Sequence, residues 1–199
     1  MARTKRVTSN EILDAVERVV MKLGVSRLSI DAVAREAGIS KSRVVYDYKS
    51  KNALLEALID RQFQRDMERN RALVEECAGT PHPELFARLR SGENVPDDVE
   101  KAVAMAITAS MSSEQSVRQK MKAWFGYDLA AMESGAKPLA ARLAYFAMLG
   151  FGCPEWFGLV EWSESDRLSF VRDIRTMYAC CPDEPALSPP VQTKGSKQS

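Results

Sequence analysis

Apolar residues recur every three or four positions along most of the chain, and no segment alternates apolar and polar residues as a strand would. The first helical segment follows Thr8, which forms a capping box with Glu11, and ends at Gly24. Its apolar face consists of Ile12, Leu13, Val16, Val19, Val20 and Leu23. The pattern predicts an all-α protein of about nine helices.

Two short helices joined by a tight turn are predicted directly afterwards. Ser29 and Ser40 are suited to cap their N-termini, and Gly38 suits the left-handed position that ends the first of them. Val44 of the second helix faces back towards the apolar face of the first, which is formed by Ile30, Val33, Ala34 and Ala37. This pattern is typical of a helix-turn-helix, although a plain packed corner of two helices would share much of it.

Later periodic segments predict six more helices. They lie at about residues 51–77, 84–90, 97–111, 114–133, 138–152 and 164–179. We expect Ser113 to cap the helix from 114, and Pro154 to kink or restart the helix from 138, which would then continue to about residue 160. We expect a helix-turn-helix domain over 1–52, a second helical domain over 53–181, and a disordered tail rich in Pro, Ser and Lys over 182–199.

The net charge of +1 hides an asymmetry along the chain. The first 51 residues hold eleven Lys and Arg against six Asp and Glu, and the remainder is acidic. A basic N-terminal domain on an acidic body fits DNA contact at one end. No apolar run is long enough to span a bilayer, and the N-terminus lacks the apolar core of a signal peptide. We therefore expect a cytoplasmic protein without a membrane partner.

The chain has few of the residue patterns that form catalytic or metal sites. The four Cys do not have the spacing of a metal site, and the single His, His82, is flanked by prolines. Redox sensing by Cys77 or Cys153 is one interpretation, but a role as small buried apolar residues is the more frequent one. We find no nucleophile–base pairing and no phosphate-binding loop, so we predict no enzyme activity, no metal and no cofactor.

The N-terminal third of the chain resembles the TetR family of bacterial transcriptional regulators. The resemblance is carried by residues 12–15, 24–25, 28–34, 37–42, 46–51 and 54–55, which include the helix-turn-helix and the Tyr-Asp-Tyr-Lys-Ser-Lys run after it. It implies a DNA-binding dimer whose variable C-terminal domain holds a ligand pocket and a dimer interface.

The residues that we expect to contact DNA lie in and around the second short helix. Helix N-termini attract phosphate, and Lys51 also matches a family position for backbone contact. Arg43 is the best candidate for reading guanine, with a phosphate contact as an equal alternative. The full predicted set is Arg3, Lys5, Ser29, Ser40, Lys41, Ser42, Arg43, Val45, Tyr46 and Lys51.

Two residues depart from the family pattern, and both make the operator sequence uncertain. Val45 stands where Tyr is usual, so one phosphate-binding hydroxyl is missing, although Val can contact a thymine methyl. Asp47 stands where His or another neutral or basic residue is common. Its carboxylate has four open roles: a helix cap, a partner of Lys49, a partner of Lys51 or an acceptor from cytosine.

The C-terminal domain is rich in Met and aromatic residues, which line both apolar pockets and ordinary cores. The resemblance favours a pocket for a small, mostly apolar or aromatic effector. We predict that it is lined by Met105, Met121, Trp124, Tyr127 and Met148.

The last two long helices resemble the pair that forms a four-helix dimer interface in this family. The predicted interface residues are Leu143, Phe146, Ala147, Gly150, Phe151, Leu168, Val171 and Ile174. Packing within one monomer would produce the same apolar stripes.

Two functions fit these observations. One is a dimeric repressor that binds a palindromic operator in double-stranded DNA and is released by the effector. The alternative is a DNA-binding protein that a protein partner, rather than a small molecule, controls.

Overall fold

The computed structural model describes residues 7–182, and over this range the chain forms nine α-helices, one 3-10 turn and no strand. The all-α prediction is therefore confirmed. The helices are α1 (Ser9–Leu23), α2 (Ile30–Ala37), α3 (Lys41–Asp47), α4 (Lys51–Glu76), α5 (Pro83–Ser91), α6 (Asp98–Ser110), α7 (Gln115–Glu133), α8 (Pro138–Trp156) and α9 (Glu164–Cys180), with the 3-10 turn at Val25–Arg27.

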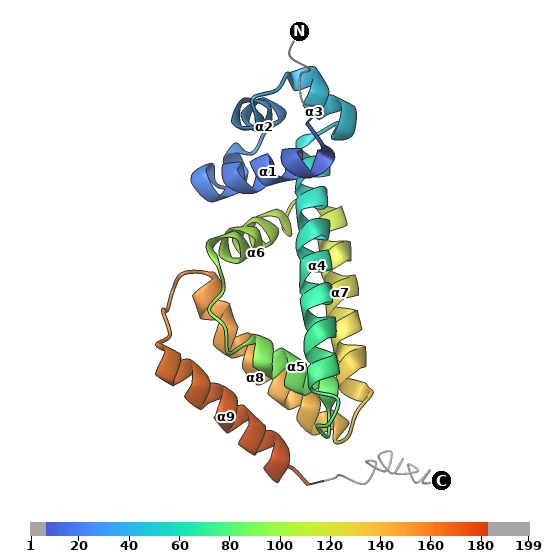
Figure 1. Cartoon of the computed structure of the whole chain (residues 1–199), viewed down its shortest axis with the longest axis vertical. Coiled ribbons are helices and arrows are strands. Elements are labelled where there is room, and N and C mark those ends of the chain that lie inside the picture. Colours follow the sequence, from blue (N-terminus) through green and yellow to red (C-terminus); the bar gives the residue numbers. More distant parts are fainter. Residues whose placement is uncertain (1–6, 183–199) are drawn as a thin grey trace, which may run out of the picture.

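The helices form an elongated molecule with a small head and a larger body (Figure 1). Helices α1–α3 form the head at one end, and the long helix α4 runs from the head along the body with α7 beside it. Helix α6 lies beneath α1, while α5, α8 and α9 form the far end. The predicted domain boundary after residue 52 falls in the first turn of α4, so one continuous helix joins the head to the body.

The head folds around the apolar face of α1. The capping box starts this helix, because the Thr8 hydroxyl accepts from the Glu11 amide at 3.2 Å and the Glu11 carboxylate accepts from the Thr8 amide at 2.8 Å. Ile12 and Val16 are fully buried, and the same apolar cluster continues into Val103 of α6. Head and body therefore share one core, so a shift of α6 or α4 acts directly on the head.

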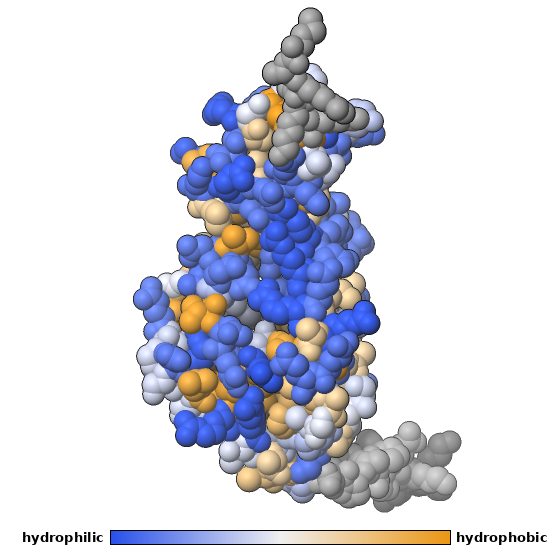
Figure 2. All heavy atoms as spheres, viewed as in Figure 1, coloured by the Kyte–Doolittle hydropathy of each residue, from blue (hydrophilic) through white to orange (hydrophobic). Residues whose placement is uncertain are grey.

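Ion pairs also join α4 to the helices on both sides of the head–body junction. Arg61 binds Asp14 at 2.7 Å and Glu17 at 2.6 Å, which fixes α4 against α1. Further along α4, Arg69 binds Glu100 of α6 at 2.7 Å. The strongly hydrophilic surface over this part of α4 is visible in Figure 2, where apolar side chains appear as small separate patches.

His82 is a structural residue of the body core. The sequence places it in a proline-flanked loop, but in the structure it is fully buried and caps α5. Its Nδ1 accepts from the Leu85 amide at 3.2 Å, so the proton lies on Nε2, which donates to the Met132 carbonyl at 3.0 Å. A Cβ at Gly135 would overlap the His82 ring, so the glycine is needed for this close approach.

Two local predictions about the body helices are wrong. Ser113 does not cap α7; the N-cap is Glu114, and no side chain caps this helix end. Pro154 does not restart the helix, because α8 runs unbroken through it and ends at Trp156 rather than near residue 160. Because Pro154 lies in the last turn, its missing amide removes only one hydrogen bond there.

Candidate nucleic-acid interface

The segment α2–turn–α3 has the geometry of a helix-turn-helix. The Ser29 and Ser40 hydroxyls accept from the amides of Ala32 and Arg43 at 3.1 and 3.2 Å, which confirms both as N-caps. Gly38 is left-handed, with φ of 66°, and the Ile39 amide donates to the Ala34 carbonyl at 3.0 Å, as in a Schellman motif. The buried Val44 packs α3 back onto the head core.

The outer face of α3 is exposed at the end of the head. Tyr46 is 77% exposed and Val45 is 40% exposed, and Lys41 and Ser42 are exposed beside them. Lys41 is bound to Asp31 at 3.0 Å, but both side chains are mostly solvated, so this pair is weak. Large apolar side chains that the head does not bury are available for contact with another molecule.

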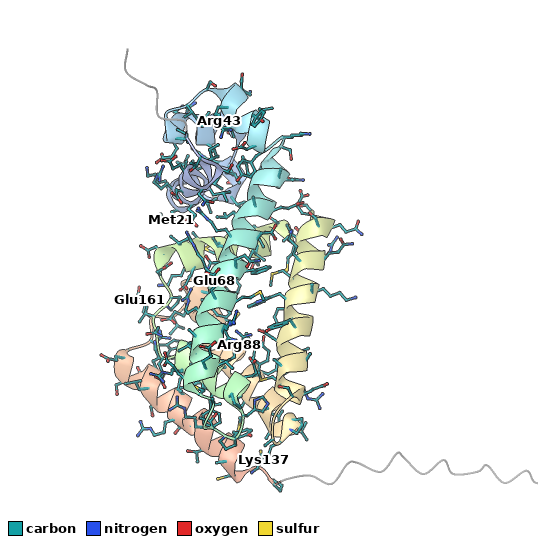
Figure 3. The ribbon with its side chains drawn as sticks, turned by 45° about the vertical axis from the view of Figure 1, so that its right-hand side comes forward. Met21, Arg43, Glu68, Arg88, Lys137 and Glu161 are labelled. Atoms are coloured by element: carbon teal, nitrogen blue, oxygen red, sulfur yellow. The ribbon has the colours of Figure 1, made fainter. Side chains whose placement is uncertain are left out.

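Arg43 is less exposed than these residues, at 26%, and its guanidinium lies over the Tyr46 ring, with 5.7 Å between Cζ and the ring centroid. Its side chain lies beside the start of α1, where Nη2 donates to the Val7 carbonyl at 2.9 Å and Nη1 pairs with Asp47 at 2.9 Å. The Asp47 carboxylate also accepts from the Ser9 hydroxyl at 2.9 Å. Arg43 and Ser9 are thus two partners of Asp47 that the sequence analysis did not name. Figure 3 shows Arg43 within the head.

Lys51 is exposed at the first residue of α4, where its ammonium donates to the Ser26 carbonyl at 3.2 Å. The Ser50 hydroxyl caps the same helix end by accepting from the Ala53 amide at 3.0 Å. Arg3 and Lys5 of the predicted interface, and positions 183–199 of the predicted tail, lie outside the described residues.

The five residues predicted to line an effector pocket differ in their surroundings. Trp124 stacks on Phe63 of α4, with ring centroids 5.3 Å apart, and Met121 packs against the head core. Met105 and Tyr127 are more than half exposed. Met148 packs onto Gly92, where it occupies the space that a Cβ would take.

The body interior instead contains a polar network that the sequence analysis missed. Asp128 is buried, accepts from the Tyr145 hydroxyl at 2.8 Å and forms an ion pair with Arg88. Arg88 lies among the side chains between α4 and α7 (Figure 3). The one available signal was a lone carboxylate within the apolar stretch 123–132.

Asp66 of α4 lies within electrostatic reach of Arg88. Burial raises the pKa of Asp66 to about 6. Because the unfolded carboxyl titrates near 3.8, the folded protein binds this proton more tightly, and stability falls as pH rises from about 4 to about 6. We expect Asp66→Asn to remove this loss and to raise the free energy of unfolding at pH 7.5 by roughly 1–2 kcal/mol. Urea denaturation at pH 4 and 7.5 measures the free energy of unfolding, with the exposed Glu68→Gln as control. If this free energy depends equally on pH in wild type and in Asp66→Asn, the prediction is wrong.

The predicted dimer-interface residues fall into two groups. Leu143, Phe146 and Leu168 are about half exposed, and Gly150 is exposed on the same side of α8. By contrast, Phe151, Val171 and Ile174 are buried within the monomer, and Ala147 is half-buried. An open groove of about 600 Å³ lies between α8 and α9, lined by Ala147, Gly150, Phe151, Pro154, Trp162, Asp166, Ser169, Phe170 and Asp173.

Residues 7–182 contain neither a metal-binding cluster nor a membrane-spanning helix. No group of three or more His, Cys, Asp or Glu in this range could hold a metal ion. No helix within the same range is long and apolar enough to cross a membrane.

Comparisons with known structures agree on the fold. A TetR family transcriptional regulator from Pseudomonas syringae pv. tomato DC3000 is 18% identical, with a TM-score of 0.59 over 89% of this chain and 96% of that chain. SmeT in complex with triclosan is 21% identical, with a TM-score of 0.61 over 84% of this chain and 89% of that chain. The multidrug binding protein EbrR complexed with malachite green is 20% identical, with a TM-score of 0.63 over 88% of this chain and 98% of that chain.

Family models account for most of both domains. One described as bacterial regulatory proteins of the tetR family matches residues 12–58, and one described as a tetracyclin repressor-like C-terminal domain matches residues 86–179. A comparison with curated proteins finds no match. With the helix-turn-helix in the head and the helical body behind it, the chain belongs to the TetR family of bacterial transcriptional regulators.

Proposed function

We propose that this regulator is a dimeric repressor that binds a palindromic operator and releases it when a small molecule binds the body. The observation that carries the proposal is the exposed outer face of α3, where Ser42, Val45 and Tyr46 are free of the head core. A short helix presented in this way at the end of a domain fits a DNA major groove.

Phosphate contacts and base contacts come from different residues in this proposal. Lys51 and the capped N-termini of α2, α3 and α4 bind phosphates, which set the position of the head on the duplex. Val45 contacts a thymine methyl, while Ser42 and Tyr46 contact neighbouring base edges or phosphates. Operator sequence is thus read mainly by small and apolar contacts.

Lys51→Ala is expected to weaken binding to every DNA sequence by a similar factor. The loss of one phosphate contact should reduce the slope of log affinity against log salt concentration by about 1. Fluorescence anisotropy over a salt series measures both quantities, and Lys122→Ala, an exposed lysine on α7, serves as the control. An unchanged slope would remove Lys51 from the interface.

The second recognition helix would come from a second copy of the chain. Half-exposed Leu143 and Phe146 continue along α8 to Gly150, whose missing side chain allows another helix to approach closely. Leu168 adds an exposed apolar residue from α9. A two-fold axis at these helices gives an isologous four-helix interface, which suits a palindromic site.

The effector is proposed to bind between α4 and α7. These helices lie side by side (Figure 1) and are joined through the Phe63–Trp124 stack and the Lys120–Asp60 ion pair at 2.6 Å. SmeT and EbrR, which share the fold, were solved with triclosan and malachite green, both aromatic compounds. An aromatic effector that replaces the stack would move α4 and, through the shared core, the recognition helix.

Operator binding is the first test of this function. Fluorescence anisotropy with the DNA upstream of the protein's own gene should show tight, steeply salt-dependent binding, with two subunits bound per site. If the protein binds this upstream DNA no more tightly than random DNA, the upstream region does not contain its operator and the protein does not regulate its own gene there. A random-sequence DNA selection then decides whether another operator exists; enrichment of no sequence would overturn operator recognition itself.

Effector response is tested on the same complex. Triclosan and malachite green serve as probes, and release of the operator should be lost in Trp124→Leu but kept in Tyr127→Leu, since Tyr127 lies exposed on the same helix. Release that persists in Trp124→Leu would move the effector away from the Phe63–Trp124 stack. If no aromatic probe releases the DNA, control by a protein partner becomes the favoured mechanism.

A further inference from the structure

We propose that Arg43 and Asp47 form a clamp that positions the recognition helix on the start of α1, so that Arg43 reads no base although it lies on that helix. The proposal rests on the DNA-binding function proposed above. It makes Arg43 and Asp47 positioning residues and assigns sequence discrimination to their exposed neighbours, chiefly Val45.

The clamp consists of contacts that cross from α3 to the residues that open α1. Arg43 Nη2 donates to the Val7 carbonyl at 2.9 Å, and Asp47 accepts from the Ser9 hydroxyl at 2.9 Å. The ion pair between Arg43 and Asp47, also at 2.9 Å, joins these two attachments. The side chains are only 26% and 13% exposed, so the pair faces the head more than the solvent.

Two of the three guanidinium nitrogens are enclosed within the head, and the third already has an acceptor there. Bidentate reading of guanine requires two donors presented together to the major groove. Nη2 is used by the Val7 carbonyl, Nη1 by Asp47, and the atoms Nε and Nη1 are fully buried. Reading a base would therefore require Arg43 to leave both partners and expose the Asp47 carboxylate next to phosphates.

The short recognition helix needs this second attachment. Helix α3 has seven residues, and Val44 is its one buried residue, so apolar packing alone holds it at one point along its length. Isolated helices of this length are not stable, and small rotations of α3 would move Val45 and Tyr46 across the groove. The clamp fixes that rotation and also neutralises Asp47, which resolves the conflict between a carboxylate on this helix and the DNA backbone.

The clamp is first tested without DNA. Amide hydrogen exchange over residues 41–47 should be faster in both Arg43→Ala and Asp47→Ala than in wild type, and the double variant should match the single ones. Val45→Ala, on the exposed face of the same helix, is the control with unchanged exchange. Unchanged exchange in both clamp variants would overturn the proposal, whatever the protein does with DNA.

The second test uses an operator obtained by selection from random DNA, together with its single-base-pair variants. Arg43→Ala and Asp47→Ala should each lower affinity by about tenfold with similar base-preference profiles, whereas Val45→Ala should lose preference at one position. Asp47→Asn, which keeps the shape but not the charge, should fall between Asp47→Ala and wild type. Loss of preference for one G·C pair in Arg43→Ala alone would show that Arg43 reads guanine and would overturn the proposal. Failure of wild type to select any sequence would instead count against the proposed function, leaving the exchange result to decide the clamp.

Discussion

Replacing Leu143 and Phe146 together with Arg should convert the protein to a monomer and lower operator affinity by about a hundredfold or more, because the second head loses its tethering. Both side chains are about half exposed on one side of α8, so the monomer fold loses little when they change. A second copy, however, would have to bury four new charges at the two-fold axis, which opposes association. Light scattering after size-exclusion chromatography gives the oligomeric state, and anisotropy gives the affinity.

Met67→Arg on α4 is the matched control for this experiment, since Met67 is exposed to a similar degree but lies outside the proposed interface. It should leave both mass and affinity unchanged. If the Leu143→Arg, Phe146→Arg variant stays dimeric, the interface does not use the exposed side of α8. If it becomes monomeric but binds the operator as tightly as wild type, paired recognition helices are not required.

Arg167→Met should lower the free energy of unfolding by about 3–5 kcal/mol, because it leaves a buried carboxylate without a partner. Arg167 and Glu155 are each 3% exposed and form an ion pair between α9 and α8. Arg167 also lies over the Phe151 ring, with 5.8 Å between its Cζ and the ring centroid. Urea denaturation at one fixed protein concentration measures the change, since the proposed dimer would make the apparent stability depend on concentration.

The double variant Arg167→Met, Glu155→Met separates the ion pair from simple packing. An apolar pair of similar volume avoids the unpaired charge, so most of the lost stability should return. Arg71→Ala is the exposed control, because the Arg71–Glu75 pair is highly solvated and should cost less than about 1 kcal/mol. A loss in Arg167→Met as small as that of the control would show that the Arg167–Glu155 pair is not effectively buried.

Local features of the fold were predictable because their causes lie within a few residues. The capping box at Thr8, the N-caps Ser29 and Ser40, and the left-handed Gly38 each depend on neighbours three to five positions away. The two errors concern signals of the same local kind: Ser113 lies one residue before the N-cap Glu114, and Pro154 lies in the last turn of α8, where a missing amide matters little.

The candidate site was only partly predictable. The position of the recognition helix followed from its pattern, but the contacts of Arg43 and Asp47 involve Val7, 36 residues from Arg43, and Ser9, 38 residues from Asp47. In the body, the sequence predicts apolar pocket residues, whereas the interior also holds the Arg88–Asp128 pair, whose members lie 40 residues apart.

The sequence by itself determined the helical class, the helix-turn-helix and the family, because periodicity, caps and a long motif are properties of consecutive residues. Only the tertiary structure decided which face of each helix is buried within the monomer. It buried Val171 and Ile174 in the core and left Phe146 exposed, although all three belong to apolar stripes. It also joined Arg43 to the Val7 carbonyl beside the start of α1. The physical reason is that an apolar stripe indicates burial and a charged side chain indicates pairing, but neither names the segment in contact. The packing of segments distant in sequence decides that contact.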